Sequence, residues 1–272
     1  MKTYPRVLTI AGSDSGGGAG IQADIKAISA TGSFAASAIT AVTVQNTLGV
    51  TAVHDIPADI VRGQISAVLG DIGADAVKIG MLSSAELVRT VRDALAEFNF
   101  TNIVLDPVMV ATSGDRLIAE DAVSVLAGEL APRARVITPN IPEAEILSGT
   151  GIKSQSDLPE AARRLSESLS SVSGRKVSVL MKAGHLDDGE LTDCFFNAEE
   201  KHIVELHSKR IDSPNTHGTG CTLSSALASY LAQGMSLDDA VIRAKEYISK
   251  AIASGAGYAI GHGHGPVNHF FR

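Results

Sequence analysis

The sequence contains no tryptophan, and only two of its 272 residues are cysteines, Cys194 and Cys221. So few cysteines in a chain of this length exclude a disulfide-rich secreted scaffold and are typical of a reduced cytosolic protein. Long apolar runs are also missing, since the run near the first residues covers only about five positions, too few for a signal-peptide core or a membrane span. We therefore expect a cytoplasmic protein with no membrane partner.

Basic residues are outnumbered by acidic ones, 23 to 30, which leaves a net charge of −7. Because a nucleic acid or an anionic membrane binds to a basic face, neither is an expected partner. With 44% hydrophobic and 19% charged residues, the composition is that of a well-packed globular protein. No repeat, low-complexity tract or linker divides the chain, so we expect one domain over residues 1–272.

Two common nucleotide-binding motifs are absent. The glycine-rich stretch AGSDSGGGAG (11–20) would continue as G-x-G-x-x-G only with glycine at position 21, which is Ile21. A P-loop requires a Gly-Lys dipeptide, and the chain has none. The stretch is therefore either a flexible turn or a loop that makes room for a small flat ligand.

Short β-rich runs alternate with segments of helical spacing, which predicts an α/β protein with a mostly parallel sheet and helices on both faces. The expected strands cover residues 6–12, 37–47, 75–80, 101–107, 134–140 and 176–184, with an antiparallel edge hairpin over 192–212. Helical spacing covers residues 20–32, 84–98, 119–130, 157–171, 221–233 and 237–254. Ligands of such sheets bind at the carboxyl ends of the strands, so the residues that follow each strand are candidates for a site.

The stretch NTHGTGC (215–221) places Gly218 and Gly220 before a helix, where Ser, Thr, Asp or Asn is the usual cap. Helix-start amides lack an intrahelical partner, and the helix dipole adds about half a positive charge, so this turn fits a phosphate group. A plain glycine-capped helix start explains the same residues.

Four side chains that follow strands each admit two interpretations. Asp106 fits a metal site or a solvated turn, and Lys182 fits a phosphate contact or an exposed strand-end lysine. Asn140 and Glu143 suit magnesium, which prefers oxygen ligands, but such a pair more often caps a helix.

The chain resembles the hydroxymethylpyrimidine/phosphomethylpyrimidine kinases of thiamine biosynthesis, within the ribokinase-like superfamily. The motifs that carry the resemblance occur in order along nearly the whole chain: AGSDSGGGAGIQADIKA (11–27), AVTVQNT (41–47), KIGML (78–82), LDPVM (105–109), TPNIPEAEIL (138–147), MKAGH (181–185), NTHGTGC (215–221) and GHGHGPVNHF (261–270). The resemblance implies a three-layer α/β/α fold and a homodimer. It also implies ATP- and Mg²⁺-dependent phosphorylation of 4-amino-5-hydroxymethyl-2-methylpyrimidine and then of its monophosphate.

The resemblance also assigns residues to roles. It places five around the pyrimidine: Gln45, Asp24, Gly12, Met81 and Val108. It places the nucleotide and its phosphates at Asp106, Asn140, Lys182, Thr216 and Gly218, and the metal at Asp106 and Glu143. The catalytic set is Cys221, Gly218, Gly220 and Lys182. For Gln45 the chemistry agrees, because a carboxamide pairs with a ring nitrogen and its neighbouring amino group, although an ordinary strand-end amide is the alternative.

Cys221 stands where many relatives in the superfamily carry a catalytic aspartate. Since a helix N-terminus lowers the pKa of a thiol, our hypothesis is that Cys221 assists deprotonation of the hydroxymethyl group. The alternative is a small buried thiol without a catalytic role, and Cys194 is expected only to pack.

Two other functions remain open: a pyridoxal kinase of the cysteine-containing type, and a non-catalytic pyrimidine-binding sensor. We expect a structural or lid role for the histidine-containing tail, residues 261–272, and a lid over residues 109–121.

Overall fold

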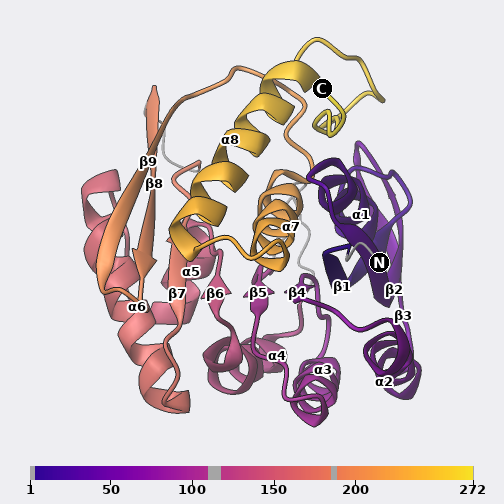
Figure 1. Cartoon of the computed structure of the whole chain (residues 1–272). Helices are drawn as coiled ribbons and strands as arrows, with labels where there is room; N and C mark the ends of the chain where they lie inside the picture. Colours follow the sequence, from indigo (N-terminus) through magenta and orange to yellow (C-terminus); the bar gives the residue numbers. More distant parts are fainter. Residues whose placement is uncertain (1–3, 110–117, 185–188, 272) are drawn as a thin grey trace.

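The central feature of the computed structural model is one sheet of nine strands (Figure 1), within the residues that the structure describes, 4–109, 118–184 and 189–271. The strand order is β3-β2-β1-β4-β5-β6-β7-β8-β9. The bounds are β1 (Arg6–Asp14), β2 (Phe34–Asn46), β3 (Gly49–Asp55), β4 (Ala76–Ile79), β5 (Ile103–Leu105), β6 (Val136–Ile137), β7 (Ser178–Met181), β8 (Glu190–Asn197) and β9 (His202–Lys209). Strands β2 to β7 in this order are parallel, which confirms the predicted mostly parallel sheet.

Helices cover both faces of the sheet and complete the three predicted layers (Figure 1). One face carries α1 (Gly20–Ala30), α7 (Thr219–Ala232) and α8 (Leu237–Gly255). The other carries α2 (Ala58–Ala67), α3 (Ala85–Glu97), α4 (Glu120–Val125), α5 (Ile141–Ser148) and α6 (Leu158–Ser173). Short helical turns lie in the segments between these elements: η1 (Val68–Ile72), η2 (Leu126–Leu130), η3 (Ala131–Arg133) and η4 (Gln155–Asp157). No helix in the described ranges is long and apolar enough to cross a membrane.

The central strands are apolar on both sides because each side packs into a separate core. In β5, Ile103 and Leu105 belong to the core under α2 to α6, whereas Val104 belongs to the core under α1, α7 and α8. This alternation explains the continuous apolar runs that predicted buried parallel strands.

Both edges of the sheet are antiparallel, although the sequence pattern indicated only one such edge. The predicted hairpin is present as β8 and β9, and β3 adds an antiparallel strand beside β2 at the other edge. Strand β3 was missed because it is exposed from Thr51 to Asp55 and therefore lacks an apolar–polar alternation. The helix expected over 119–130 is divided between α4 and the turn η2.

Candidate active site

A cavity of about 690 Å³ lies where the strand-end loops meet the start of α7; we call it the main cavity. Residues at or just after the carboxyl ends of β1, β2, β4, β5, β6 and β7 line it, as expected for a sheet of this class. It brings together nearly the whole predicted site: Gly12, Gln45, Met81, Asp106, Val108, Asn140, Glu143, Lys182, Thr216, Gly218, Gly220 and Cys221. Asp24 is the exception.

The start of α7 is a glycine-built turn without a side-chain cap. Gly218 is the N-cap residue, with φ +78 and no side-chain hydrogen bond to the first-turn amides. A side chain at Gly218 would overlap the carbonyl oxygen of Gly18 in the first glycine-rich loop. A Cβ at Gly220 would lie 3.4 Å from both Asp106 Oδ2 and Lys182 Nζ. The two glycines therefore let the helix start approach the first loop and a charged pair, which suits a bound anion.

That charged pair consists of Asp106 and Lys182. Asp106 follows β5 and is 2% exposed. Its Oδ1 accepts hydrogen bonds from Lys182 Nζ and from Thr138 Oγ1, both at 3.0 Å. Burial alone would raise the pKa of Asp106, but the charges of Lys182 and Lys78 outweigh it and lower that pKa. Asp106 is therefore an ionised carboxylate inside the main cavity.

Asn140 and Glu143 form a capping box at the start of α5, the alternative that the sequence left open. Glu143 N donates to Asn140 Oδ1 at 2.9 Å, and Asn140 N donates to Glu143 Oε2 at 2.8 Å. Glu143 is nevertheless 5% exposed and lines the main cavity. Burial, together with the charge of Asp106, raises its pKa to about 7 in spite of Lys182. Two close buried carboxylates compensated by one lysine fit a divalent cation by charge and by their oxygen donors.

Cys221 is partly accessible, but its pKa moves in the direction opposite to our expectation. Burial raises the pKa of the thiol to about 11, even though the charge of Lys78 lowers it. The predicted lowering by the helix N-terminus is therefore wrong for the site without ligands, because loss of hydration outweighs the helix field.

Asp24 lies in α1 beneath the site and does not line the main cavity. It is fully buried, and both of its oxygens lie 2.9 Å from Lys78 Nζ. Thr9 and Ser225 also donate to Asp24, at 2.6 and 2.7 Å. Lys78, which does line the main cavity, was missed by the sequence reasoning. Its signal was a charged residue in the apolar run DAVKIG.

Asp14 and His217 were also missed. Asp14 Oδ1 accepts from Gly16 N, and its Oδ2 accepts from Gly18 N, so this carboxylate shapes the first glycine-rich loop. His217 Nε2 lies 2.9 Å from Asp14 Oδ2, which joins that loop to the turn before α7. An aspartate among glycines, which often bonds to its own loop, was the available signal.

The histidine-containing tail packs against the end of β2. Thr47 Oγ1 accepts hydrogen bonds from His262 N and Gly263 N, and Thr47 O accepts one from His264 N. These backbone contacts support the structural interpretation of the tail. Most of the lid expected over residues 109–121 lies outside the described residues.

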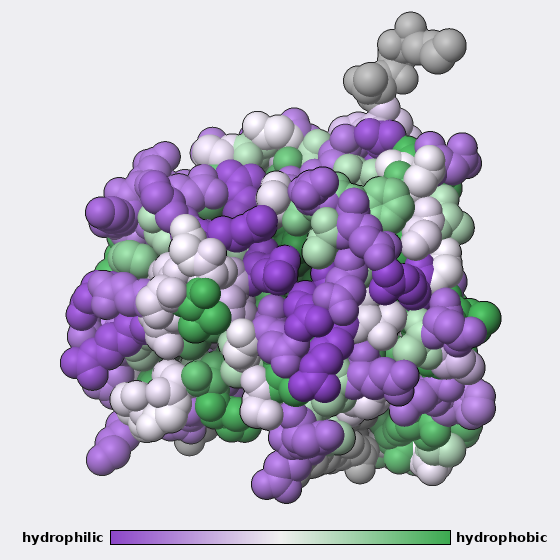
Figure 2. All heavy atoms as spheres, turned by 90° about the horizontal axis from the view of Figure 1, so that it is seen from below, coloured by the Kyte–Doolittle hydropathy of each residue, from purple (hydrophilic) through white to green (hydrophobic). Residues whose placement is uncertain are grey.

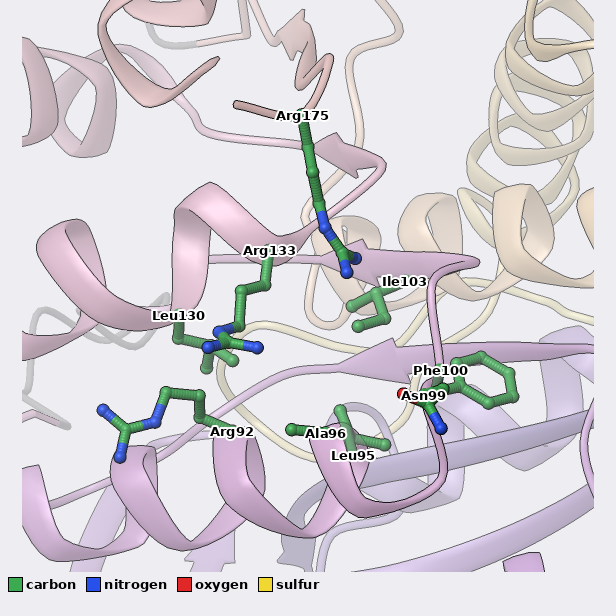
Figure 3. A pocket seen from close by; sticks show the side chains of 9 residues that line it. All are labelled: Arg92, Leu95, Ala96, Asn99, Phe100, Ile103, Leu130, Arg133 and Arg175. Carbon is green, nitrogen blue, oxygen red and sulfur yellow. The ribbon is translucent and has the colours of Figure 1, made fainter. Parts of the chain in front are cut away.

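A second, smaller pocket of about 70 Å³ lies near the start of β5 (Figure 3). Arg133 and Arg175 reach toward its apolar lining, which includes Ile103, the first residue of that strand. It shares no lining residue with the main cavity. Seen from below, the molecule is mainly hydrophilic, with apolar side chains in small scattered groups (Figure 2). Because the main cavity is larger than this pocket and is lined by the predicted residues, it is the stronger candidate for an active site.

Comparisons with known proteins show to which family the chain belongs. The chain matches the sequence profile of the phosphomethylpyrimidine kinase family over residues 14–268. It is 50% identical over 265 residues to the hydroxymethylpyrimidine/phosphomethylpyrimidine kinase of Rhizobium meliloti, covering 97% of each chain. It is 50% identical over 268 residues to the thiamine biosynthesis bifunctional protein ThiED of Geobacter sulfurreducens, with 98% of this chain matched. It spans about half, 53%, of that longer relative.

Solved structures give the same result. The phosphomethylpyrimidine kinase of Clostridium difficile 630 superposes with a TM-score of 0.78 at 44% identity, covering 91% of this chain and 99% of that one. An ADP complex of Bacillus subtilis pyridoxal kinase superposes with a TM-score of 0.86 at 33% identity and 98% coverage of both chains. Fold and site thus define a ribokinase-like small-molecule kinase. Within that class, the chain belongs to the phosphomethylpyrimidine kinase family.

Proposed function

We propose that the protein transfers the γ-phosphoryl group of ATP to 4-amino-5-hydroxymethyl-2-methylpyrimidine, and then phosphorylates the monophosphate to the diphosphate. One observation carries the proposal: the uncapped start of α7, the Asp106–Lys182 pair and Gln45 all face the same cavity. A phosphoryl-transfer enzyme needs an anion site, a charge clamp and a substrate pocket within reach of one another. A sensor that only binds pyrimidine has no use for the first two.

The pyrimidine end of the site is built from Gln45 and small or apolar neighbours. Gly12, Met81 and Val108 line the same cavity, and they would offer a flat ring a surface without polar side chains. A carboxamide both donates and accepts, which matches a ring nitrogen beside an amino group. Asp24 then supports this pocket from below through Lys78.

The phosphate end lies at the start of α7. The amides at Gly218, Gly220 and Cys221 would bind the γ-phosphoryl oxygens, with Thr216 and Lys182 beside them. Asp106 and Glu143 would hold Mg²⁺, which neutralises phosphate charge, and Asn140 would contact the nucleotide phosphates. The ADP complex of the related pyridoxal kinase supports ATP as the donor.

Removal of the hydroxyl proton contributes little to the energy barrier of this reaction. The substrate oxygen forms a bond to phosphorus while the bond to the ADP oxygen breaks, and in a loose transition state the hydroxyl proton leaves late. Cys221 lies in the helix-start turn that lines the cavity. With its thiol protonated near neutral pH, we propose a contact with the hydroxymethyl group and a modest contribution to the rate.

We also propose a cytoplasmic homodimer. Cys194 and Cys221 are both free thiols, as suits a reducing compartment. The β2–β3 edge exposes apolar side chains, with Val44 59% and Val53 45% exposed. An exposed apolar edge strand is a natural surface for a second copy.

The decisive experiment follows ATP-dependent phosphorylation of the hydroxymethylpyrimidine and, in parallel, of pyridoxal. Formation of the pyrimidine diphosphate, with much weaker turnover of pyridoxal, is the expected result. Faster turnover of pyridoxal would mean that pyridoxal is the substrate, and the proposed phosphate site would still stand. If neither compound is phosphorylated, the non-catalytic pyrimidine-binding sensor becomes the better hypothesis.

A further inference from the structure

His217 joins segments that are far apart in the sequence. It lies in the turn before α7, yet its Nε2 is 2.9 Å from Asp14 Oδ2 and 3.4 Å from the Gln45 amide nitrogen, Nε2. The ring packs against Gly18, where a Cβ would lie 2.5 Å from ring carbon Cδ2. With 8% of the residue exposed, His217 is held in place on several sides.

Asp14 determines where the His217 ring carries its proton. Burial alone would raise the pKa of Asp14, but hydrogen bonds from His217, Ala19 and Gly16 outweigh it and lower that pKa. The ionised carboxylate can only accept hydrogen bonds. His217 Nε2 therefore carries a hydrogen and donates it to Asp14 Oδ2.

This proton in turn determines the orientation of the Gln45 amide. A protonated Nε2 cannot accept from an amide nitrogen, so the contact is favourable only with the amide oxygen toward the ring. In the structure Gln45 Oε1 lies 3.0 Å from Thr43 Oγ1, so turning the amide over places its nitrogen toward that hydroxyl instead. The Thr43 hydroxyl donates to the Ser13 carbonyl at 2.9 Å, so its oxygen is available as an acceptor. In this arrangement the His217 ring, the Thr43 hydroxyl and one amide N–H each have an acceptor, and only the second amide N–H is left over.

One acceptor and one donor of the amide remain for the main cavity, which Gln45 lines. We propose that His217, held by Asp14, is a positioning residue that sets the Gln45 amide and thereby selects the direction in which an aminopyrimidine binds. The inference rests on the proposed function, because it concerns the same pyrimidine pocket. A reversed amide would exchange donor and acceptor, and the ring would have to turn over, which would carry its 5-hydroxymethyl group to the opposite side.

The test compares two substrates in two variants. His217→Phe keeps a ring against Gly18 and removes the donor, whereas Thr43→Val keeps the shape of the side chain and removes the other amide partner. For each we would measure kcat/KM with hydroxymethylpyrimidine and with the analogue that lacks the 4-amino group. Both variants should lose at least about 10-fold of the wild-type preference for the amino compound. KM for ATP should stay within about twofold, because the phosphate end is unchanged.

His207→Phe is the matched control, because this histidine lies on β9 with its side chain 70% exposed. It should keep the wild-type preference. An equal loss with both substrates in His217→Phe and Thr43→Val would mean that these residues only support the structure, and would overturn the inference. If His217→Phe does not fold, the preference of Thr43→Val decides. Failure of the proposed function is separate, because the wild type itself would then not phosphorylate the pyrimidine.

Discussion

The carbonyl oxygen of Gly18 occupies the position that a side chain at Gly218 would need. The two glycine-rich motifs are thus packed against each other, and Gly218 also has a φ of +78, which disfavours other residues. This contact places the first-turn amides of α7 over the main cavity.

Gly218→Ala should therefore lower kcat at least about 100-fold, because the amides proposed to bind the phosphoryl group would move. Stability should fall by at least about 1 kcal/mol from the backbone strain alone. Gly63→Ala is the control, since Gly63 lies inside α2 with open space around it; it should be neutral or slightly stabilising. Steady-state kinetics and urea denaturation would check both, and a fully active Gly218→Ala variant would refute the anion-site role.

Lys78→Met should destabilise the protein strongly. It would leave the buried Asp24 carboxylate without its ion-pair partner, and breaking such a pair costs about 3–5 kcal/mol. Lys250→Met, at an exposed position of α8, should change the free energy of unfolding by less than about 0.5 kcal/mol. The measurement is chemical denaturation of both variants. If both variants lose equally little free energy of unfolding, the Lys78–Asp24 pair contributes little to stability.

Glu143 should give the ligand-free protein a characteristic pH dependence. Its folded pKa of about 7 lies above the ordinary value of 4.5, so between these values the folded state holds a proton that the unfolded state has lost. Stability from this group therefore falls as pH rises through that window. Thermal melts between the two pKa values should show this decrease in stability, and Glu143→Gln should remove the decrease that Glu143 causes.

The same titration predicts tighter Mg²⁺ binding at higher pH, because a metal ligand must be deprotonated. Apparent affinity, measured by calorimetry in the presence of a non-hydrolysable ATP analogue, should rise between about pH 6 and about pH 8. Glu143→Gln should show weak binding with little dependence on pH. A wild-type affinity that is constant over this range would argue against Glu143 as a ligand.

Cys221→Ala should lower kcat by less than about 10-fold, since a thiol with a pKa of about 11 is protonated at neutral pH and proton transfer is late in this reaction. Iodoacetamide should also react with Cys221 more slowly than with free cysteine. Cys194→Ala, at a buried position in β8, is the control. A loss of more than about 1,000-fold in Cys221→Ala would instead show an essential base.

Charges on the β2–β3 edge should separate the proposed dimer. Val44→Lys combined with Val53→Lys would place two cations on the exposed apolar edge, which opposes association. Light scattering after size exclusion should then report a monomer. Val172→Lys, at a position 62% exposed on α6, should leave the oligomeric state unchanged. A wild-type protein that is already monomeric would remove the dimer proposal.

Much of the fold was readable from the sequence because its signals are local. Apolar runs closed by Gly, Pro or Asp identified β1, β4, β5 and β7, and 3.6-residue spacing identified α1, α3, α6, α7 and α8. The exposed strand β3 carries no such periodicity and was missed. The order of the strands in the sheet depends on pairings between distant segments, which no local pattern specifies.

Candidate site residues were predictable for the related reason that parallel strands all end at one edge of the sheet. Asp106 and Lys182 follow β5 and β7, and the structure brings them within 3.0 Å. The sequence could not give their electrostatic state, nor could it find His217 and Asp14, which are 203 residues apart.

The sequence by itself determined the α/β class, the place of the candidate site residues at the strand ends and the glycine-built start of α7, because each depends on neighbouring residues. Only the tertiary structure decided that Lys78 pairs with Asp24, that the pKa of Cys221 rises instead of falling, and that His217 faces Gln45. Those outcomes depend on burial and on partners from distant segments. Loss of hydration and the approach of a charge are properties of the assembled fold.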